Sequence, residues 1–378
     1  MMDNKTIRMI GIDLDGTLLT MSKELTNSAR KSVEEAIRAG IEVVPVTGRP
    51  LAGVPAEVLA IPGIRYIITS NGANTYDLSA WDRENGFLTA LREGTGLPPG
   101  REGDNLSGTA HTGAVHADTV HADTVHADAA GTAAENAGAV HADAADTAAE
   151  NAGEANTDAM NEGVLRRYPL PGEAVLRKEH MPHETVREIL AAAGGEDVIR
   201  EIFLRGVGYH DEKTQKMLED RFSIRPPILR YINRSRRVVR DFEDLLSEES
   251  SHVENISLMF LSRESRDSVF GKLKKIRGSR GEKIIHVLLP WLTDLEVTHV
   301  LADKWLAVRD LADRLGVCPG QIMTLGDGDN DRPMLQNAGL GIAMGNAPDF
   351  VKMTADLITL DNEHDGAAAA IRQVLEEG

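Results

Sequence analysis

The sequence predicts an α/β protein in which a doubly wound parallel sheet carries a second, inserted α+β domain. Short apolar runs near both ends of the chain alternate with helical stretches, which is typical of parallel strands joined by helices. The middle of the chain lacks that alternation, and residues 100–162 contain almost no large apolar side chain. We therefore expect a core built from residues 1–85 and 299–378, and an inserted domain over residues 86–298.

The core strands are expected where apolar residues run together. These runs lie at residues 7–12, 41–46, 66–69, 321–325 and 341–344. After the first run, residues 27–39 place Val33, Ala36 and Ile37 at helical spacing, and Gly40 follows as a typical C-terminal stop. Right-handed crossovers between such strands build a Rossmann-like core.

The middle of the chain, residues 163–300, predicts the inserted α+β domain. A helix is expected over residues 183–193, and strands are expected over residues 199–207 and 256–260. Because these elements do not continue the alternating pattern, we place them outside the parallel core sheet.

Residues 100–162 are repetitive. Val-His-Ala-Asp occurs four times in this tract, and Thr-Ala-Ala-Glu-Asn-Ala-Gly occurs twice. Repeats this short have no hydrophobic face of their own, so they predict a disordered low-complexity tract rather than a solenoid. The His-x-Asp pairs are an alternative signal for a transition metal, but a solvated tract is the favoured interpretation.

Composition narrows the class of protein. The chain has 378 residues with 42% hydrophobic content, enough for a sizeable core, and a formal charge of −18. That charge argues against a nucleic-acid or membrane-surface partner, and nothing in the sequence indicates an oligomeric state. Cys318 is the only cysteine, so neither a disulfide framework nor a thiolate zinc site is expected. Arg8 and Asp13 break the first apolar run, which argues against a signal peptide or membrane span and favours a cytoplasmic protein.

Two carboxylates stand directly after the first apolar run. Asp13 and Asp15 follow residues 7–12, and Gly16 allows a tight turn after them. Side chains that alternate along a strand would put both acids on the same side. Oxygen ligands of this kind suit Mg²⁺, whereas an ordinary Asp-Gly turn is the alternative.

Further polar groups follow the other core strands. Thr47 offers a hydroxyl, Gly48 permits close approach of the backbone, and Arg49 is able to form a charge-assisted fork with an anion. Lys304 lies on or just before an expected helix that runs to Leu315, where its ammonium would neutralise a bound phosphoryl group. Each of these signals is weak alone, but strand ends in open α/β sheets are where ligands bind.

The stretch Gly326-Asp327-Gly328-Asp329-Asn330-Asp331 is a stronger signal. It presents several carboxylates at a tight turn between a strand and a helix. A calcium loop is the alternative, but the bidentate Glu at the twelfth position and the incoming helix of an EF-hand are both missing.

Four motifs follow one another in a fixed order. They are Asp13-x-Asp15-Gly16-Thr17, Thr47-Gly48-Arg49, Lys304 and Gly326-Asp327-Gly328-x-Asn330-Asp331. In this order they resemble the motifs of the haloacid dehalogenase-like superfamily, and more specifically those of the Cof-type phosphatases. Three further stretches resemble the junction into the family's cap domain, its return strand and its C-terminal signature: Ser70-Asn71-Gly72-Ala73, Leu295-Glu296-Val297-Thr298 and His364-Asp365-Gly366.

The resemblance implies a covalent mechanism. Asp13 would be the nucleophile and form an aspartyl phosphate. Asp15 would protonate the leaving oxygen and then take a proton from the hydrolytic water. Thr47 and Lys304 would hold the phosphoryl oxygens. Further contacts with the substrate are implied at Gly48, Arg49, Asn71 and Asn330.

The resemblance also implies Mg²⁺ as the cofactor. Its ligands would be the carboxylates of Asp13 and Asp327 and the backbone carbonyl of Asp15, with Asp331 close by. An all-oxygen set of this kind is what Mg²⁺ prefers.

The implied activity is hydrolysis of small phosphorylated metabolites, such as sugar phosphates or phosphorylated cofactors. A phosphosugar mutase that uses the same aspartyl phosphate is one alternative, and a non-catalytic binding module is another. Trp305 follows Lys304 where the family usually has Gly, so we expect it to affect the choice of substrate. The repetitive tract enters where the cap begins, and we expect the fold to tolerate it.

Overall fold

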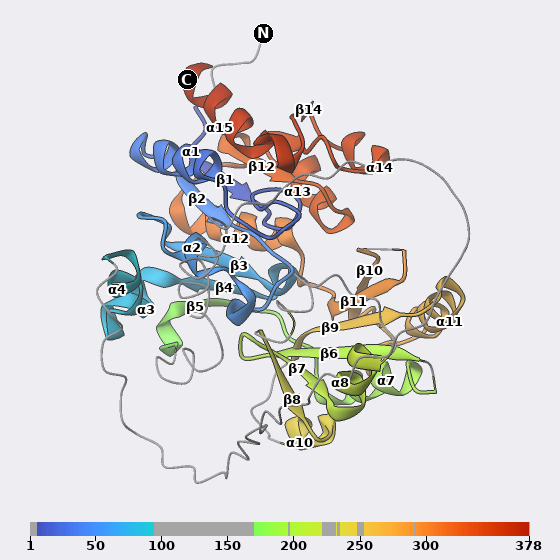
Figure 1. Ribbon diagram of the computed structural model, residues 1–378. Helices are drawn as coiled ribbons and strands as arrows, with labels where there is room; N and C mark the ends of the chain where they lie inside the picture. Colours follow the sequence, from blue (N-terminus) through green and yellow to red (C-terminus); the bar gives the residue numbers. More distant parts are fainter. Residues whose placement is uncertain are drawn as a thin grey trace, which may run out of the picture.

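The computed structural model describes residues 6–93, 170–195, 197–220, 232, 235–247, 253–290 and 292–377. The tract at residues 100–162, predicted to be disordered, lies outside the described residues. The described strands form three sheets, which Figure 1 shows as a core and a second layered domain. The predicted α/β class with an inserted α+β domain is confirmed.

The core sheet is parallel throughout, in the order β14-β13-β12-β1-β2. Its strands are β1 (Met9–Ile12), β2 (Glu42–Pro45), β12 (Ile322–Gly326), β13 (Leu340–Ala343) and β14 (Leu357–Ile358). The central strand β1 pairs with β2 on one side and with β12 on the other. The carboxyl ends of these strands therefore open at one edge of the sheet, where ligands of open α/β sheets bind.

Helices cover both faces of the core sheet, as expected of a doubly wound fold (Figure 1). The core helices are α1 (Asn27–Arg38), α2 (Ala56–Leu59), α12 (Lys304–Leu315), α13 (Arg332–Asn337), α14 (Asp349–Lys352) and α15 (Gly366–Glu377). Alternate residues of β1 serve the two faces: Ile10 packs in one apolar cluster with Val33 of α1 and Ile371 of α15, whereas Met9 packs in another with Val308 of α12. Period-two alternation of buried side chains thus builds both layers.

A three-stranded antiparallel sheet extends the core. It contains β3 (Tyr66–Thr69), β4 (Asn74–Asp77) and β5 (Val175–Lys178). The run at residues 66–69 is therefore a strand as expected, but only a single parallel bridge, Val46 to Ile68, links it to β2. Helices α3 (Leu78–Asn85) and α4 (Phe87–Glu93) follow, with Trp81 and Phe87 buried in the core cluster.

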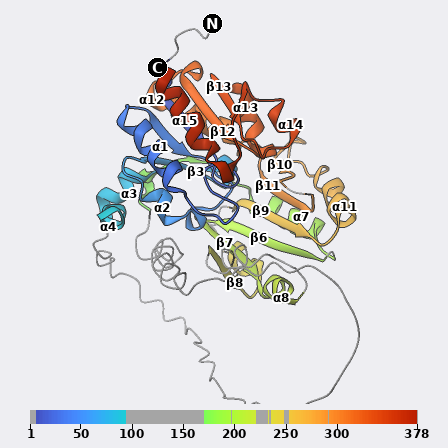
Figure 2. The same cartoon turned by 45° about the horizontal axis from the view of Figure 1, so that its top comes forward.

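The second domain is built on a six-stranded sheet in the order β10-β11-β9-β6-β7-β8. Its strands are β6 (Val198–Leu204), β7 (Val207–Asp211), β8 (Arg236–Val239), β9 (Val253–Phe260), β10 (Ile285–Leu288) and β11 (Asp294–His299). Its helices are α7 (His183–Ala192), α8 (Glu212–Asp220), α10 (Phe242–Leu246) and α11 (Arg263–Leu273). In both views the sheet lies at the end of the molecule opposite α15 (Figures 1 and 2). We call this domain the cap.

The strand expected over residues 199–207 is in fact a hairpin. Arg205 and Gly206 have φ angles of 53° and 77°, and they separate β6 from β7. Two successive residues with positive φ form the tight turn that suits the twist of antiparallel strands. Only one of the two residues is Gly, so the turn was not evident from the sequence.

Two elements within the predicted limits of the inserted domain pack with the core instead. Helix α4 and strand β5 fall within residues 86–298, yet β5 pairs with β4 and α4 buries Phe87 and Leu88 in the core cluster. We therefore propose that the cap begins after β5 and ends with β11, one residue beyond the predicted limit. Among the described residues, no helix is both long enough and apolar enough to cross a membrane.

Candidate active site

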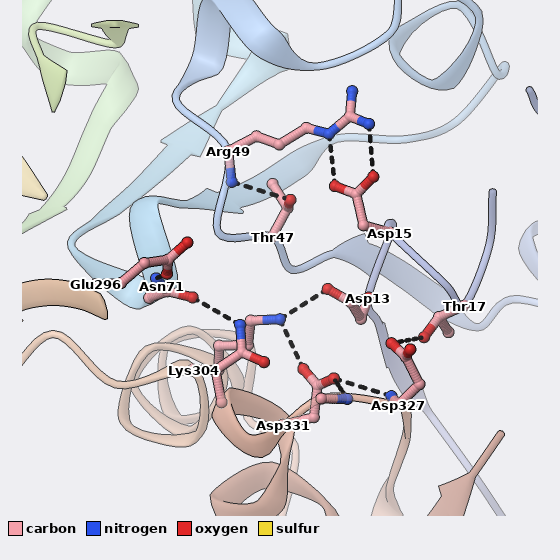
Figure 3. Close-up of polar contacts among 12 residues, drawn as sticks. Asp13, Asp15, Thr17, Thr47, Arg49, Asn71, Glu296, Lys304, Asp327 and Asp331 are labelled. Carbon is pink, nitrogen blue, oxygen red and sulfur yellow. Dashed lines mark hydrogen bonds and ion pairs between the residues drawn. The ribbon is translucent and has the colours of Figure 1, made fainter. Parts of the chain in front are cut away.

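The loops at the carboxyl edge of the core sheet bring five predicted residues together (Figure 3). Asp13 follows β1, Thr47 follows β2, and Asp327 and Asp331 follow β12. Lys304 is the first residue of α12. Segments that are far apart in the sequence meet here because parallel strands end at the same edge.

Lys304 is fully buried between two carboxylates. Its Nζ lies 2.7 Å from Asp13 Oδ1 and 2.6 Å from Asp331 Oδ1. Burial alone would lower the pKa of Lys304, but the two carboxylates outweigh it and raise that pKa above its usual value. The ammonium therefore stays charged, next to the carboxylate that is the predicted nucleophile.

Asp13, Asp327 and Asp331 form a cluster of three carboxylates. One oxygen from each lies within 4.8 Å of the others. Burial, together with the negative neighbours, raises the pKa of Asp13 well above its usual value and raises the pKa of Asp327 to about 7. A single ammonium does not compensate three clustered acids, two of them buried and one half-buried, so the cluster is suited to a further cation.

Backbone groups and a hydroxyl orient this cluster. Asp331 Oδ2 accepts hydrogen bonds from the backbone N–H groups of Asp327 (2.9 Å) and Gly328 (2.8 Å). Thr17 Oγ1 donates to Asp327 Oδ1 at 3.3 Å. Gly16 has a φ of 83°, and a Cβ at this position would lie 2.3 Å from Asp327 Oδ2. The turn after β1 thus needs Gly both for its backbone conformation and for room beside the carboxylate.

Asn346 is part of the site, although no motif in the sequence indicates it. Its Nδ2 donates to Asp327 Oδ2 at 3.1 Å and to the backbone carbonyl of Gly16 at 2.9 Å. Its Oδ1 in turn accepts from the backbone N–H of Asn362 at 3.1 Å. The available signal was its place directly after the predicted strand at residues 341–344, at the same edge of the sheet.

The carboxylate of Asp15 points away from this cluster (Figure 3). Arg49 donates to it from Nε and Nη2, and Lys23 Nζ lies 2.7 Å from Oδ1. Although burial raises the pKa of Asp15, Arg49 and then Lys23 outweigh it and hold that pKa well below its usual range. Strand β1 ends at Ile12, so the alternation that would put Asp13 and Asp15 side by side does not continue to Asp15.

Arg49 is committed to protein partners in this arrangement. Besides Asp15, it donates from Nη1 to the backbone carbonyl of Gly53 at 2.8 Å. Thr47 Oγ1 accepts from the backbone N–H of Arg49 at 3.1 Å. The predicted contact of Arg49 with substrate therefore stays a prediction, whereas its contact with Asp15 is a feature of the structure.

The remaining predicted residues meet at the junction with the cap. Asn330 Nδ2 donates to Asn71 Oδ1 at 2.9 Å, and Asn71 Nδ2 donates to the carboxylate of Glu296 on cap strand β11. A Cβ at Gly48 would lie 3.1 Å from Asn71 Oδ1, so Gly48 permits this approach. Glu296 lies in the stretch that resembles the return strand of the family, a pattern that predicts no role for this residue at the site.

A cavity of about 250 Å³ opens between the cap and the core beside these residues. From the core it is lined by Asn71, Lys304 and Asn330, and from cap strand β10 it is lined by His286 and Leu288. Trp305, expected to affect the pocket, is 8% exposed and instead packs in an apolar core cluster. The site thus has a charged floor on the core and a wall supplied by the cap.

Comparisons with known proteins agree with this geometry. The family model of the haloacid dehalogenase-like hydrolases matches residues 10–85 and 168–371. A 5-amino-6-(5-phospho-D-ribitylamino)uracil phosphatase of Bacillus subtilis is 46% identical over 80 residues, which cover 21% of this chain and 32% of that protein. The chain thus spans about a third of the length of the curated relatives that it matches first.

Two solved structures share the fold over nearly the whole chain. A haloacid dehalogenase-like hydrolase from B. subtilis has a TM-score of 0.63 at 20% identity, with 97% of this chain and 99% of that chain covered. A sugar phosphatase of subclass IIB has a TM-score of 0.59 at 17% identity, with 97% and 98% covered. Together with the family model, these likenesses lead to one assignment. The chain belongs to the haloacid dehalogenase-like hydrolases, of the Cof type that its motifs predicted.

Proposed function

We propose that the protein is a Mg²⁺-dependent phosphatase that hydrolyses small phosphorylated metabolites, with Asp13 as the nucleophile. The observation that carries the proposal is the buried ammonium of Lys304 between Asp13 and Asp331, at the edge of a cluster of three carboxylates. A positive group there would hold a phosphoryl group against the nucleophile. The names of the relatives, a phosphatase and a sugar phosphatase, support the same substrate class.

The residues present fit Mg²⁺. Asp13 and Asp327 offer carboxylate oxygens, with Asp331 beside them, and all three lie in one cluster. The backbone carbonyl of Asp15 stays a predicted ligand. Oxygen donors at a buried, negatively charged site are what a hard divalent cation requires. When bound, the ion would offset the charge that the carboxylate nucleophile and the phosphate ester bring together.

Asp13 would carry the phosphoryl group between two half-reactions. In the first, its carboxylate oxygen bonds to phosphorus while the bond from phosphorus to the leaving oxygen breaks. Lys304 and Thr47 hold the phosphoryl oxygens during this transfer. In the second, water attacks the same phosphorus, inorganic phosphate leaves and the carboxylate of Asp13 is restored.

Asp15 would give a proton to the leaving oxygen and take one from the hydrolytic water. Its ion pairs with Arg49 and Lys23 favour the second of these roles and oppose the first. With Arg49 and Lys23 as partners Asp15 is ionised, which suits it to take a proton from the hydrolytic water. To donate a proton to the leaving oxygen, it has to be protonated first, and both cations oppose that. We infer that Asp15 exchanges its contact with Arg49 for the leaving group in the first half-reaction.

The test is a hydrolysis assay on a panel of phosphate esters, with Mg²⁺ and after treatment with EDTA. Asp13→Asn should reduce the rate of hydrolysis by about a thousandfold or more, because the amide is not a nucleophile. Asp349→Asn is the control, since Asp349 is an exposed carboxylate at the start of core helix α14 and does not line the cavity. Acid quenching during turnover should leave one phosphoryl group on the peptide that contains Asp13.

Three other results of these assays would contradict the proposal. Undiminished hydrolysis by Asp13→Asn would contradict the assignment of the nucleophile. Absence of hydrolysis across the panel by the unmodified chain would contradict the phosphatase. Transfer of a labelled phosphoryl group to a second hydroxyl, without release of phosphate, would establish the mutase instead.

A further inference from the structure

The junction between core and cap contains an unusual turn at Ser70–Gly72. Ser70, Asn71 and Gly72 have φ angles of 51°, 57° and 93°, so three successive residues are in the left-handed region. At Gly72 a Cβ would lie 2.3 Å from the backbone carbonyl oxygen of Asp303, which explains the Gly. Ser70 and Asn71 lack the backbone freedom of Gly. Residues with a side chain keep this backbone conformation only where surrounding contacts hold them.

The core holds the backbone of this turn. The N–H of Ser70 donates to the carbonyl of Arg49 at 2.9 Å, and the N–H of Asn71 donates to the carbonyl of Thr47 at 3.0 Å. The turn is thereby fixed to the loop after β2, which carries the predicted phosphoryl-binding hydroxyl. These contacts leave the side chains of Ser70 and Asn71 for other partners.

The cap holds those side chains through two carboxylates, of which Glu254 is buried and Glu296 is half-buried. Ser70 Oγ donates to Glu254 Oε2 at 2.8 Å, and Glu254 lies on strand β9. Asn71 Nδ2 donates to Glu296, which lies on the neighbouring strand β11. Of the two, only Glu296 contacts a side chain that lines the cavity.

The contact with Glu296 determines which way the amide of Asn71 faces. An ionised carboxylate only accepts hydrogen bonds, so it requires the NH₂ end of the amide. The oxygen of Asn71 then faces Asn330 and accepts from its Nδ2 at 2.9 Å. A core loop, a cap strand and the loop after β12 are thus linked through one side chain.

We propose that Glu296 is a positioning residue: from the cap, it sets the orientation of Asn71 and, through Asn71, that of Asn330 on the core side of the cavity. Packing of the cap on the core and orientation of these two asparagines are then one event, because the carboxylate is carried by β11. The proposal rests on the proposed function only in that the cavity receives the phosphate ester.

The alternative is that Glu296 merely supports the fold. Matched variants distinguish this structural role from the positioning role. Glu296→Ala removes the acceptor, whereas Glu296→Gln keeps an oxygen that is able to accept from Asn71. Asp294→Asn is the control, because Asp294 lies on the same strand and the same face but bonds to Thr293. Asn71→Ala and the double variant Asn71→Ala/Glu296→Ala complete a double-mutant cycle with Glu296→Ala.

The first readout needs no catalysis. In protein labelled with ¹⁵N at asparagine, the side-chain NH₂ signals of Asn71 and Asn330 should both move in Glu296→Ala and stay near their original positions in Glu296→Gln and Asp294→Asn. Asn330 contacts Asn71 rather than Glu296 in the described structure, so its response reports the relay through Asn71. Unmoved Asn330 signals in Glu296→Ala would overturn the proposal.

The second readout is binding of inorganic phosphate in the presence of Mg²⁺, together with kcat/KM for the best ester. Glu296→Ala should weaken both by about tenfold, as the loss of a hydrogen bond to a charged group does. In the Asn71→Ala background the same change should have no further effect, since Glu296 acts through Asn71. Additive losses would mean a merely structural role. If the unmodified chain hydrolyses no ester, the proposed function fails, while the asparagine signals still decide the role of Glu296.

Discussion

Arg49 forms a bidentate ion pair with Asp15: Arg49 Nε donates to Oδ2 and Nη2 donates to Oδ1, both at 2.6 Å. Lys23 Nζ contacts the same carboxylate at 2.7 Å, but the side chain of Lys23 is 27% exposed and that of Arg49 only 6%. The two cations therefore share one acceptor and differ in geometry and burial. Geometry and desolvation make the Arg49 pair the stronger of the two.

The difference predicts unequal effects on stability. Arg49→Met should lower the free energy of unfolding at neutral pH by about 1.5–3 kcal/mol, because it removes hydrogen bonds to a charged group. Lys23→Met should cost less than about 1 kcal/mol, as is usual for an exposed pair. Unfolding in urea measures both, and equal losses would contradict the assignment.

The same pair has a pH dependence of known sign. The pKa of Asp15 is held below its usual value of 3.8, so the stability it provides is present above that value and is lost as the pH falls through the lowered pKa. The difference between the unmodified chain and Arg49→Met should therefore shrink below about pH 4. A constant difference down to acid unfolding would show that packing, and not the charge pair, accounts for the loss.

Lys304 predicts a link between stability and metal. Lys304→Met leaves Asp13 and Asp331 buried without their cation, which should cost about 3–5 kcal/mol when EDTA is present. Mg²⁺ should then raise the Tm of this variant more than that of the unmodified chain, because the cation replaces the missing charge. Arg309→Met, on the same helix but 45% exposed, is the control. An equal rise of the Tm in all three proteins would count against metal binding at these carboxylates.

The elements that the sequence predicted correctly depend on local pattern. Apolar runs mark β1 and β12, and the acids that follow each run lie where parallel strands end. The contacts that escaped prediction join distant segments: Asn71 meets Glu296 from 225 positions away, and Asn346 meets Gly16 from 330 positions away. No spacing within one segment encodes such a pair, since it depends on how distant segments of the chain pack together.

Asp15 shows a second limit of local pattern. Alternation along a strand holds only while the backbone stays extended, and β1 ends at Ile12. Asp15 therefore turns toward Arg49 rather than toward the carboxylate of Asp13. The hairpin at Arg205 is a similar case, because the sequence does not indicate that a residue other than Gly has a positive φ there.

Glu254 predicts a pH dependence of the opposite sign to that of Asp15. Burial raises the pKa of this carboxyl above its usual value of 4.5 in the folded protein, despite hydrogen bonds from Gly206 and Ser70. Between those two values the folded state binds more protons than the unfolded state, so the free energy of unfolding should rise as the pH falls through this window. Glu254→Gln cannot titrate and should lack that rise. Urea unfolding at several pH values gives the comparison, and parallel profiles would refute the prediction.

His286 predicts selectivity among substrates. It lies on cap strand β10, lines the cavity with Leu288, and has a pKa lowered by burial and by Lys283. It is therefore a neutral hydrogen-bonding group at neutral pH, suited to a hydroxyl of the leaving group rather than to the phosphate. His286→Ala should raise KM about tenfold for esters with large polar leaving groups. His286→Gln, which keeps a neutral donor and acceptor, should restore much of that loss. A small aryl phosphate that does not reach β10 should be hydrolysed equally by all three proteins. An equal loss of kcat/KM with every ester would show instead that His286 supports the common chemistry on the core.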